Sequence, residues 1–444
     1  MTGWARGLYS ALTTLGQPLL RSKLARRGRQ EPGYLEAVDE RFGHYGQPLE
    51  GASELVWVHA VSLGETRTAG VLLKALRAQY PSLRLLLTHG TATGREEGRA
   101  LLQAGDVQVW QPWDSPPAVR RFFDHYKPRL GLLMETEIWP NLVAEATARG
   151  MPLVLVNARL SAKSLRQAQR LSPLALPAYG ALSAVYAQTE ADAERFRQLG
   201  TPVIGVFGNL KFDATPDAAQ LAQGQAWRQA LGQPVLMFAS SREGEEDDFL
   251  EQIKAFTHEG WAHAAIDSVA KGVQTAFKPL IVPRHPQRFD EVAALIERHG
   301  LRVSRRSQWT GSPAASARAI NADVWLGDSL GEMALYYALS DAALLGGSFA
   351  PLGGQNLIEA AACGCPVVMG PHTFNFTESA ELAEAEGAAL RVAGMAAAVQ
   401  AGLGLVGDSA ALAKGVAAGL AFAARNRGAT AATVEALRGY LQPI

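Results

Sequence analysis

The sequence predicts an α/β protein of two domains, each built on a parallel sheet. The chain has 444 residues, 48% of them hydrophobic, and a chain of this length usually forms more than one hydrophobic core. Short apolar runs alternate with helical stretches, which is typical of parallel sheets covered by helices on both faces. The alternation stops over residues 211–232, a polar helical stretch containing Pro216 and Gly224, and then restarts.

The apolar runs predict two groups of strands. In the first domain they are 55–60, 83–88, 107–110, 130–134, 153–156, 184–187 and 203–205, with helices at 66–79, 94–104 and 117–126 between the first of them. In the second domain they are 235–239, 280–282, a strand at Val303, 324–326, 342–345 and 366–369. We therefore divide the chain into an N-terminal segment and lead-in, two domains and a closing helix: 1–45, 46–210, 211–425 and 426–444.

Two segments interrupt this pattern. Residues 260–276 are mildly apolar without clear periodicity, and we predict an inserted helix or loop there. Residues 304–316 are rich in serine and arginine and predict an exposed loop.

The N-terminal segment combines an apolar stripe with a basic collar. Its large apolar residues recur at steps of three or four, as on one face of a helix: Trp4, Leu8, Leu12, Leu15 and Leu19. Six basic residues precede the first acid, Glu31: Arg6, Arg21, Lys23, Arg26, Arg27 and Arg29. No run reaches the roughly 18 apolar residues of a membrane-spanning helix. We therefore favour an interfacial helix on anionic lipid; the alternative is a helix packed on the first domain.

Composition and motifs exclude several function classes. The formal net charge is zero, so nothing indicates general nucleic-acid binding. Cys363 and Cys365 have no partners at zinc-binding spacing. The chain lacks a Walker-type phosphate loop, a dinucleotide fingerprint and an Asp-x-Asp metal signature. We expect no cofactor and no metal, so any nucleotide is held without one.

The stretch from 346 to 371 has the pattern of a nucleotide site. The first of two glycine pairs, Gly346 and Gly347, directly follows a predicted strand, and Asn356 and Glu359 stand at the start of a predicted helix. Glycines let backbone N–H groups approach a phosphate, toward which a helix points its positive end. Asn356 and Glu359 are one helical turn apart, and a carboxylate there suits a ribose diol. The alternative is an ordinary strand–helix–strand turn.

Acidic residues follow two predicted strands of the first domain. Glu65 begins a helix and lies where a carboxylate could accept a proton, but Ser62 and Glu65 also have capping-box spacing. Glu135 and Glu137 follow another strand, where unpaired carboxylates are rarely tolerated. Glu137 fits a helix N-terminus beside Pro140, which leaves Glu135 as the better functional acid.

In the second domain, a predicted anion site stands at two strand ends. Ser240 and Ser241 open a helix, and Arg284 ends the next strand with a guanidinium suited to phosphate or carboxylate. The alternatives are a capping box formed by Ser240 with Glu243 and a surface ion pair for Arg284.

Eight motifs in order resemble the bacterial 3-deoxy-D-manno-octulosonic acid (Kdo) transferases of lipopolysaccharide synthesis. They are HAVSLGE (59–65), METEIWPNL (134–142), VNARLS (156–161), GNLKFD (208–213), SSREGEE (240–246), VPRHPQRF (282–289), GDSLGEM (327–333) and the stretch from Gly346 through GPHTFNF (370–376).

This resemblance implies a glycosyltransferase B-type fold, two Rossmann-like domains facing an interdomain cleft. It implies CMP-Kdo as donor, bound in the second domain, and the tetra-acylated lipid A precursor as acceptor, bound in the first. Glu65 is then the general base, and Glu135 is also required for activity. Donor-binding residues are Ser240, Ser241, Arg284, Gly347, Asn356 and Glu359. We assign His59, Arg159 and Lys211 to the acceptor or the cleft.

The resemblance also implies a mechanism and a location. Glu65 takes the proton of an acceptor hydroxyl as its oxygen attacks the anomeric carbon of Kdo, and CMP leaves from the opposite face with inversion. The enzyme is expected on the cytoplasmic face of the inner membrane, anchored by its N-terminal segment. Two alternatives are a nucleotide-sugar 2-epimerase on the same scaffold and a non-catalytic lipid- or sugar-binding protein. An epimerase does not explain the N-terminal segment, and retention of Glu65 with the nucleotide motif speaks against a non-catalytic protein.

Overall fold

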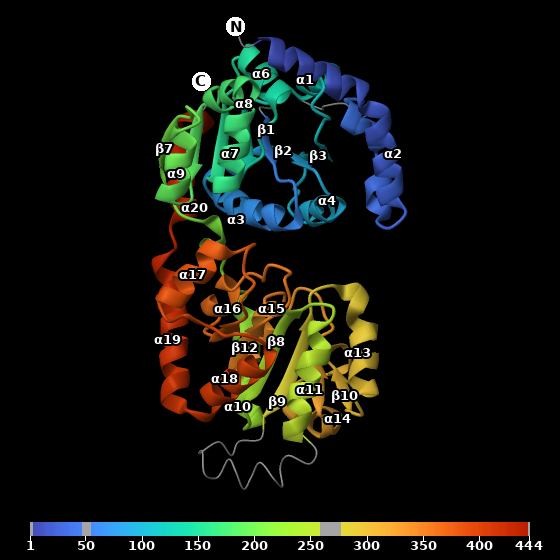
Figure 1. Cartoon of the computed structure of the whole chain (residues 1–444), viewed down its shortest axis with the longest axis vertical. Helices are drawn as coiled ribbons and strands as arrows, with labels where there is room; N and C mark the ends of the chain where they lie inside the picture. The colour runs from blue at the N-terminus through green and yellow to red at the C-terminus, as the bar shows by residue number, and fades with distance from the viewer. Residues whose placement is uncertain (1–2, 47–54, 258–276, 443–444) are drawn as a thin grey trace. The chain divides into compact units, whose positions relative to one another are not determined.

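The computed structural model describes residues 3–46, 55–257 and 277–442, so the predicted insertion at 260–276 lies outside the described residues. The chain divides into two compact units (Figure 1). The first contains Met1–Ala214 and Asn426–Ile444, and the second contains Thr215–Arg425. The sequence places the corresponding boundaries after residues 210 and 425.

The first unit is built on a sheet of seven parallel strands in the order β3-β2-β1-β4-β5-β6-β7. The strands are β1 (Leu55–His59), β2 (Arg84–His89), β3 (Val107–Trp110), β4 (Leu130–Met134), β5 (Leu153–Ala158), β6 (Ala184–Ala187) and β7 (Val203–Val206). The predicted α/β class with parallel strands is thereby confirmed. The order reverses between β1 and β4, which makes their carboxyl ends the place where such sheets bind ligands.

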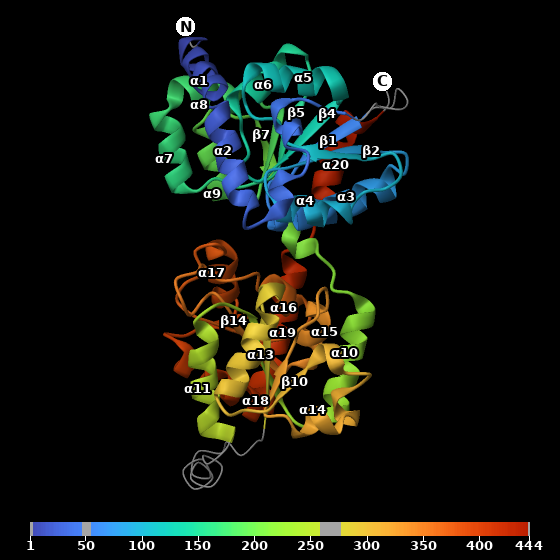
Figure 2. The same ribbon diagram turned by 90° about the vertical axis from the view of Figure 1, so that its right-hand side faces the viewer.

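Helices cover both faces of this sheet (Figures 1 and 2). They are α1 (Gly3–Leu15), α2 (Gln17–Gly28), α3 (Leu63–Gln79), α4 (Ala92–Arg99), α5 (Pro116–Tyr126), α6 (Pro140–Ala148), α7 (Ala162–Arg170), α8 (Ser172–Gly180), α9 (Glu190–Arg197) and α20 (Ala429–Leu441), with 3₁₀ turns η1 (Pro32–Leu35), η2 (Val38–Phe42) and η3 (Leu210–Asp213). Because strand side chains alternate, Trp57 packs with Phe122 of α5 while Val58 packs with Leu72 of α3 and Leu437 of α20.

The C-terminal helix α20 completes the first unit. It lies beside α3, and Leu437 is 0% exposed. The hydroxyl of Tyr186 donates to the carbonyl of Ala436, and the carboxylate of Asp213 accepts the N–H groups that open the helix, those of Gly428 and Thr430. Residues more than 200 positions apart therefore share one core.

The N-terminal helix α1 packs on the first unit through its polar side. The hydroxyl of Ser10 donates to Asn141 Oδ1 (2.8 Å), and the indole of Trp113 donates to the carbonyl of Thr13 (2.7 Å). Its large apolar residues point away from the unit and are exposed, as is one at the start of α2: Trp4, Leu8, Leu12, Leu15 and Leu19. The helix is thus packed on the first domain, as one alternative held, but it leaves the predicted stripe uncovered.

Among the described residues, no single helix is long and apolar enough to cross a membrane. Met395–Gly407 and Ser409–Leu441 meet the length and composition test only as a pair that is bent by 104°.

The second unit repeats the architecture of the first. Its seven parallel strands have the order β10-β11-β9-β8-β12-β13-β14. They are β8 (Val235–Ser241), β9 (Lys278–Pro283), β10 (Val303–Arg305), β11 (Val324–Leu326), β12 (Ala342–Leu345), β13 (Val367–Met369) and β14 (Ala389–Arg391). Here the order reverses between β8 and β12, so a ligand site is expected at their carboxyl ends.

The helices of the second unit again lie on both faces of its sheet (Figure 2). They are α10 (Ala218–Leu231), α11 (Glu245–Thr257), α13 (Phe289–Arg298), α14 (Ala317–Asn321), α15 (Met333–Leu339), α16 (Ile358–Ala362), α17 (Thr377–Ala385), α18 (Met395–Gly407) and α19 (Ser409–Arg425), with 3₁₀ turns η4 (Pro286–Arg288), η5 (Arg306–Gln308) and η6 (Pro313–Ala315).

The prediction of an exposed loop at 304–316 is wrong in one respect. Ser304 belongs to β10 and is buried, as is Trp309, whose ring packs edge-on to Trp325 with centroids 5.0 Å apart. The indole of Trp309 donates to Ser304 Oγ (3.0 Å). The neighbouring arginine side chains are held by carboxylates, for example Arg305 by Asp328 (2.7 Å). A single tryptophan anchors this polar segment to the core.

We predict that Leu437→Ala weakens the first unit selectively. Removing a fully buried leucine costs about 3 kcal/mol of unfolding free energy, and α20 belongs to the first unit although it is remote in sequence. Hydrogen–deuterium exchange of peptides from each unit measures it: exchange should accelerate over β1 and α3, whereas Arg438→Ala, at an exposed position of the same helix, should leave it unchanged. Equal acceleration in both units would contradict the assignment.

Candidate active site

Glu65 stands at the carboxyl end of β1, in the first turn of α3. Its Oε2 accepts the N–H of Val61 (2.9 Å), and its Oε1 accepts the hydroxyl of Ser62 (2.8 Å). Ser62 Oγ in turn accepts the N–H of Glu65 (3.3 Å). Ser62 and Glu65 therefore form the helix cap that the sequence offered as an alternative, with the backbone N–H of Val61 in place of that of Ser62, and this cap fixes the position of the carboxylate.

The environment of Glu65 also suits proton transfer. Burial raises the pKa of its carboxyl to about 7, and the negative charges of Glu135 and Glu137 act in the same direction. The hydrogen bonds from Val61 and Ser62 oppose this rise, because they favour the ionised form. A carboxylate with a pKa near neutrality accepts a proton from a hydroxyl group more readily than an ordinary glutamate does. Capping and proton transfer can therefore belong to the same side chain.

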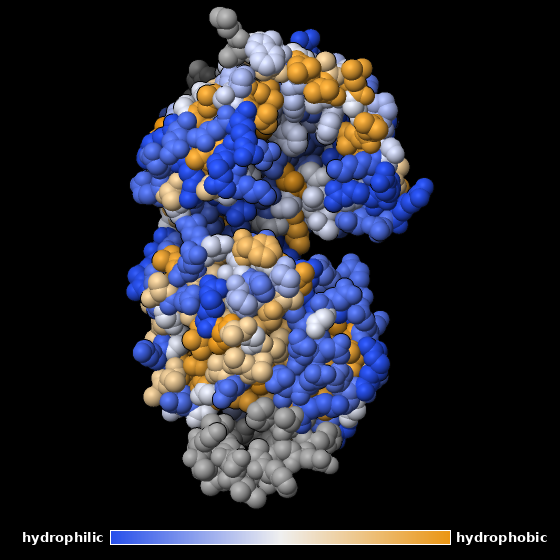
Figure 3. All heavy atoms as spheres, viewed as in Figure 1, coloured by the Kyte–Doolittle hydropathy of each residue, from blue (hydrophilic) through white to orange (hydrophobic). Residues whose placement is uncertain are grey.

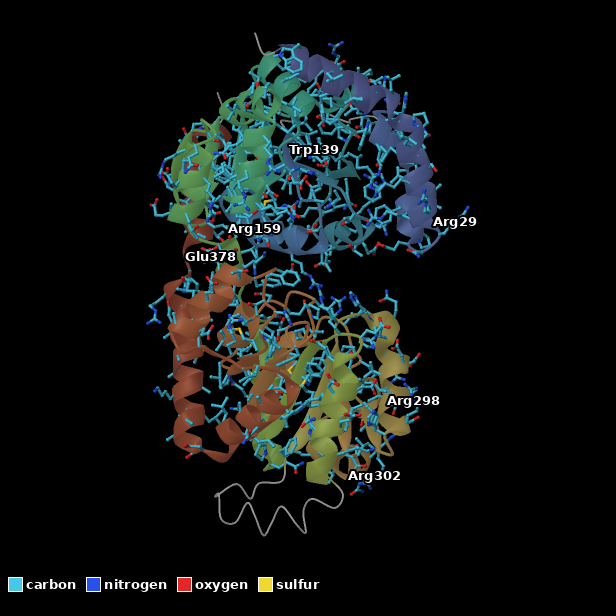
Figure 4. All side chains as sticks on the ribbon, viewed as in Figure 1. Arg29, Trp139, Arg159, Arg298, Arg302 and Glu378 are labelled. Carbon is cyan, nitrogen blue, oxygen red and sulfur yellow. The ribbon has the colours of Figure 1, made fainter. Side chains whose placement is uncertain are left out.

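Glu135 follows β4, the strand next to β1, and forms ion pairs with two residues that the sequence analysis assigned to the acceptor or the cleft. Its Oε2 lies 2.9 Å from Arg159 Nε, and its Oε1 lies 3.2 Å from Lys211 Nζ. Glu135 is 6% exposed, and its φ of 56° is a strained left-handed conformation. Arg159, labelled in Figure 4, follows β5, and Lys211 lies in η3. Three residues singled out in the sequence are thus brought together from separate elements.

The predicted role of Glu137 at the start of α6 is wrong. The carboxylate that accepts the N–H groups of Asn141 (3.0 Å) and Leu142 (2.8 Å) belongs to Asp114, which precedes α5. Glu137 instead accepts the indole N–H of Trp139 (3.0 Å), labelled in Figure 4, and burial raises its pKa. No local spacing links Asp114 to α6, so the sequence could not show this cap.

His59, assigned to the acceptor or the cleft, is 0% exposed. Its Nδ1 lies 2.8 Å from Thr88 Oγ1 on the neighbouring strand. Burial, together with His89, lowers the pKa of the ring to about 3, so the ring is neutral at physiological pH. The side chain ties β1 to β2, and we assign it no ligand contact.

In the second unit, the predicted donor residues gather at the carboxyl ends of neighbouring strands. Arg284 follows β9, Ser240 and Ser241 end β8, and Gly347 follows β12. The N–H of Arg284 donates to the carbonyl of Ser241 (3.0 Å). A Cβ atom on Gly346, just before Gly347, would lie 2.3 Å from the carbonyl oxygen of Ser240, so only glycine fits between these strand ends.

A residue missed in the sequence organises this edge. The carboxylate of Glu245, 2% exposed, accepts four backbone N–H groups: those of Gly347 (2.7 Å), Phe349 (3.0 Å), Ala350 (3.0 Å) and Arg242 (3.2 Å). These donors of the glycine loop are therefore occupied by a carboxylate of the protein itself. The expectation that they approach a phosphate is corrected accordingly.

The predicted capping box of Ser240 with Glu243 is absent from the described segment. Strand β8 continues through Ser241, Ser240 has a φ of 54°, and α11 starts only at Glu245. The hydroxyl of Ser241 donates to Glu246 Oε1 (2.9 Å). The strand is longer than predicted because Ser241 still pairs with Pro283 of β9.

Asn356 and Glu359 differ from the prediction in their secondary structure. Helix α16 begins at Ile358, and Asn356 lies before it, with its Oδ1 accepting the N–H of Ile358 (3.1 Å). Glu359 is half-buried in the helix. Burial raises the pKa of the Tyr337 phenol well above its usual value, and the negative charge of Glu359 adds to this rise. The positive charge of Arg284 lowers the same pKa. Glu359 and Arg284 therefore border the same buried ring.

In the part of the chain that the structure describes, no group of three or more His, Cys, Asp or Glu side chains is arranged to hold a metal ion. Metal independence stays a prediction.

Comparison with known proteins identifies relatives of this chain. A family model described as 3-deoxy-D-manno-octulosonic-acid transferase matches residues 36–214. A 3-deoxy-D-manno-octulosonic acid transferase of Bordetella pertussis is 46% identical, covering 98% of this chain and 99% of its own.

Two solved structures are similar in fold. A glycosyltransferase from Rickettsia africae ESF-5 has a TM-score of 0.54 at 11% identity, with coverage of 89% of this chain and 100% of its own. A UDP-GlcNAc 2-epimerase from Neisseria meningitidis, bound to UDP-GlcNAc, has a TM-score of 0.53 at 14% identity, with coverage of 88% and 99%. At these identities both speak to the fold alone.

We predict that Glu245→Gln loosens the glycine loop. An amide keeps one acceptor but turns an N–H₂ group toward backbone donors, which should cost about 2 kcal/mol of stability in the second unit. Hydrogen–deuterium exchange over residues 346–352 should accelerate at least tenfold. Glu243→Gln, an exposed position two residues earlier, is the matched control. Equal exchange in both variants would show that the carboxylate does not hold the loop.

Proposed function

The chain belongs to the family of 3-deoxy-D-manno-octulosonic acid (Kdo) transferases, and on this premise we propose that it transfers Kdo from CMP-Kdo to the tetra-acylated lipid A precursor. It is a glycosyltransferase with the two-domain, Rossmann-like fold of the B type. The observation that carries the finer proposal is Glu65, a fixed carboxylate at the switch point of the first sheet with a pKa near 7.

The proposed step is an inverting displacement. The ionised carboxylate of Glu65 takes the proton of an acceptor hydroxyl while that oxygen forms a bond to the anomeric carbon of Kdo. The bond between this carbon and the phosphate oxygen of CMP breaks on the opposite face, and CMP leaves with the bonding electron pair. The acceptor loses a proton to Glu65, and the leaving phosphate gains negative charge, so charge balances.

Glu135, Arg159 and Lys211 support this step through charge and position. The negative charge of Glu135 helps to raise the pKa of Glu65, and its two cationic partners hold it in place at the neighbouring strand end. The strained backbone of Glu135 fits a residue kept for function, since a glycine would adopt the same φ without cost.

On the donor side, we assign the CMP moiety to the strand-end residues of the second unit. Arg284 offers a guanidinium to the phosphate, where leaving-group charge develops. Glu359, half-buried beside it, suits the ribose hydroxyls, and Ser240 and Asn356 lie at the same edge. Ser241 and Gly347 contribute by shaping this edge, because the hydroxyl of Ser241 and the N–H of Gly347 bind Glu246 and Glu245. We propose that the reaction needs no metal ion.

The N-terminal helices support a location on the cytoplasmic face of the inner membrane. Hydrophobic side chains gather over α1 in Figure 3, and Arg29, labelled in Figure 4, projects from the end of α2. An exposed apolar stripe beside a basic segment binds anionic bilayers by insertion and by charge. A nucleotide-sugar 2-epimerase shares the fold, but a soluble nucleotide sugar gives such a stripe no use.

We predict that Glu65→Gln lowers transfer at least 100-fold while stability is kept. Glutamine still completes a capping box but cannot accept the proton. Transfer of Kdo to the lipid acceptor is read by mass spectrometry, with unfolding measured in parallel. Ser62→Ala is the converse control: it should cost about 1 kcal/mol of stability and far less activity.

The same base sets the pH dependence. Only the ionised form of Glu65 accepts a proton, so wild-type kcat/KM should rise with pH through about 7 and level off above it. A profile that is flat from pH 5.5 to 8.5, or near-normal transfer by Glu65→Gln, would return Glu65 to a purely structural role.

We predict that the double change Leu12→Glu and Leu15→Glu weakens binding to anionic vesicles at least tenfold, because the stripe loses apolar area and gains negative charge. Vesicle sedimentation measures it, and raising the salt concentration should weaken the wild type as well. Thr14→Glu, exposed but off the stripe, should have a much smaller effect. Undiminished sedimentation of the double variant would exclude the stripe as the membrane contact.

A further inference from the structure

An apolar groove lies on the first unit between α1, α6 and α8, which Figure 2 shows side by side. Its volume is about 240 Å³. Val143 and Thr147 of α6 line one side, and Leu174, Pro177 and Ala178 of α8 line the other. Among the described residues that line it, only Arg6 of α1 carries a charge, and within the described chain Arg6 forms no ion pair.

The groove lies beside two features already assigned. Pro140, which lines it, stands three residues after Glu137, and the charge of Glu137 acts on Glu65. Beside it are the exposed apolar residues of α1, such as Trp4 and Leu8, and Leu176 of α8. The groove therefore borders α1, which carries the outward stripe, and the start of α6, which follows Glu137 in the chain.

We propose that this groove binds one acyl chain of the glycolipid acceptor, with Arg6 facing the anionic headgroup. The inference rests on the proposed function, since it presupposes a lipid acceptor. It goes further by naming the residues that hold the lipid part and by separating them from those that act on the sugar.

The chemistry of the groove favours an acyl chain over a peptide. A peptide segment would bring backbone N–H and C=O groups against alanine, proline, valine and leucine side chains, which offer them no hydrogen-bond partner. A hydrocarbon chain has no such groups. The free guanidinium of Arg6 complements a phosphate at the point where a headgroup would begin.

The volume limits how much of the lipid enters. An apolar cavity of about 150 Å³ holds one benzene ring, so a groove of about 240 Å³ holds part of one chain. The other chains of a tetra-acylated lipid would remain in the bilayer. The groove would therefore draw one chain aside and orient the headgroup, without extracting the whole lipid.

Photo-crosslinking tests the location directly. The full-length protein is mixed with the lipid A precursor carrying a diazirine on an acyl chain, irradiated, and mapped by mass spectrometry. We expect adducts on residues 140–147 and 173–181. Adducts confined to the outward stripe at residues 4–19, adducts elsewhere, or no adducts would contradict the proposal that the groove binds an acyl chain.

A matched pair of variants tests its contribution. Thr147→Trp fills the groove, whereas Ala148→Trp places the same ring on an exposed position of the same helix outside it. Thr147→Trp should lower the groove adducts and raise the acceptor KM about tenfold, the effect of losing roughly two buried methylenes. The KM for CMP-Kdo should stay constant.

The outcomes separate the two proposals. Wild-type protein that transfers no Kdo to the lipid would refute the proposed function itself. Wild-type transfer with equal acceptor KM in the two tryptophan variants would refute only the groove. A Thr147→Trp variant whose KM for CMP-Kdo rises as much as that for the acceptor would also refute it, because the substitution would then disturb the whole enzyme.

Discussion

The loop that follows β12 in the second unit depends on one buried carboxylate, Glu245, which accepts four backbone N–H groups at the switch point of that sheet. Left unpaired in the core, those donors would be costly, so the carboxylate both stabilises the loop and sets its path. Glu65 occupies the equivalent place in the first unit, at the helix that follows the unit's first strand. It accepts the N–H of Val61 and the hydroxyl of Ser62, and burial raises its pKa to about 7, which suits proton transfer.

Equivalent positions in the two units, Glu65 and Glu245, thus have different roles. The carboxylate of Glu245 accepts four backbone N–H groups, so its role is to hold the loop. At Glu65, burial raises the pKa, and the negative charges of Glu135 and Glu137 add to the rise. Glu135 stands at the neighbouring strand end, where Arg159 and Lys211 bind both of its oxygens. The different roles of Glu65 and Glu245 therefore follow from their immediate surroundings, because the fold around them is the same.

The fold was largely predictable because buried parallel strands need continuous apolar runs; β3 and β4 have the predicted bounds. Glu135 could be found because it directly follows such a strand, and Glu65 because it begins the helix after another. Glu245 could not, because its partners Gly347 and Ala350 lie 102 and 105 residues away. The same holds for Asp114, which caps a helix 27 residues later, and for Trp309, a single buried ring in a polar segment. Contacts between residues so far apart in the sequence produce no pattern in the spacing of residue types, so the sequence could not reveal them.

The docking of α20 on the first unit has a consequence for biosynthesis. Leu437 belongs to the core beneath β1 and α3, yet it leaves the ribosome after the entire second unit. The second unit can therefore reach its native state first, reversing the usual order in which the N-terminal domain folds ahead of the rest. During that interval the nascent first half exposes both its unfinished core and its apolar N-terminal stripe. Early capture of that stripe by a bilayer would shelter the chain from aggregation until its last helix arrives.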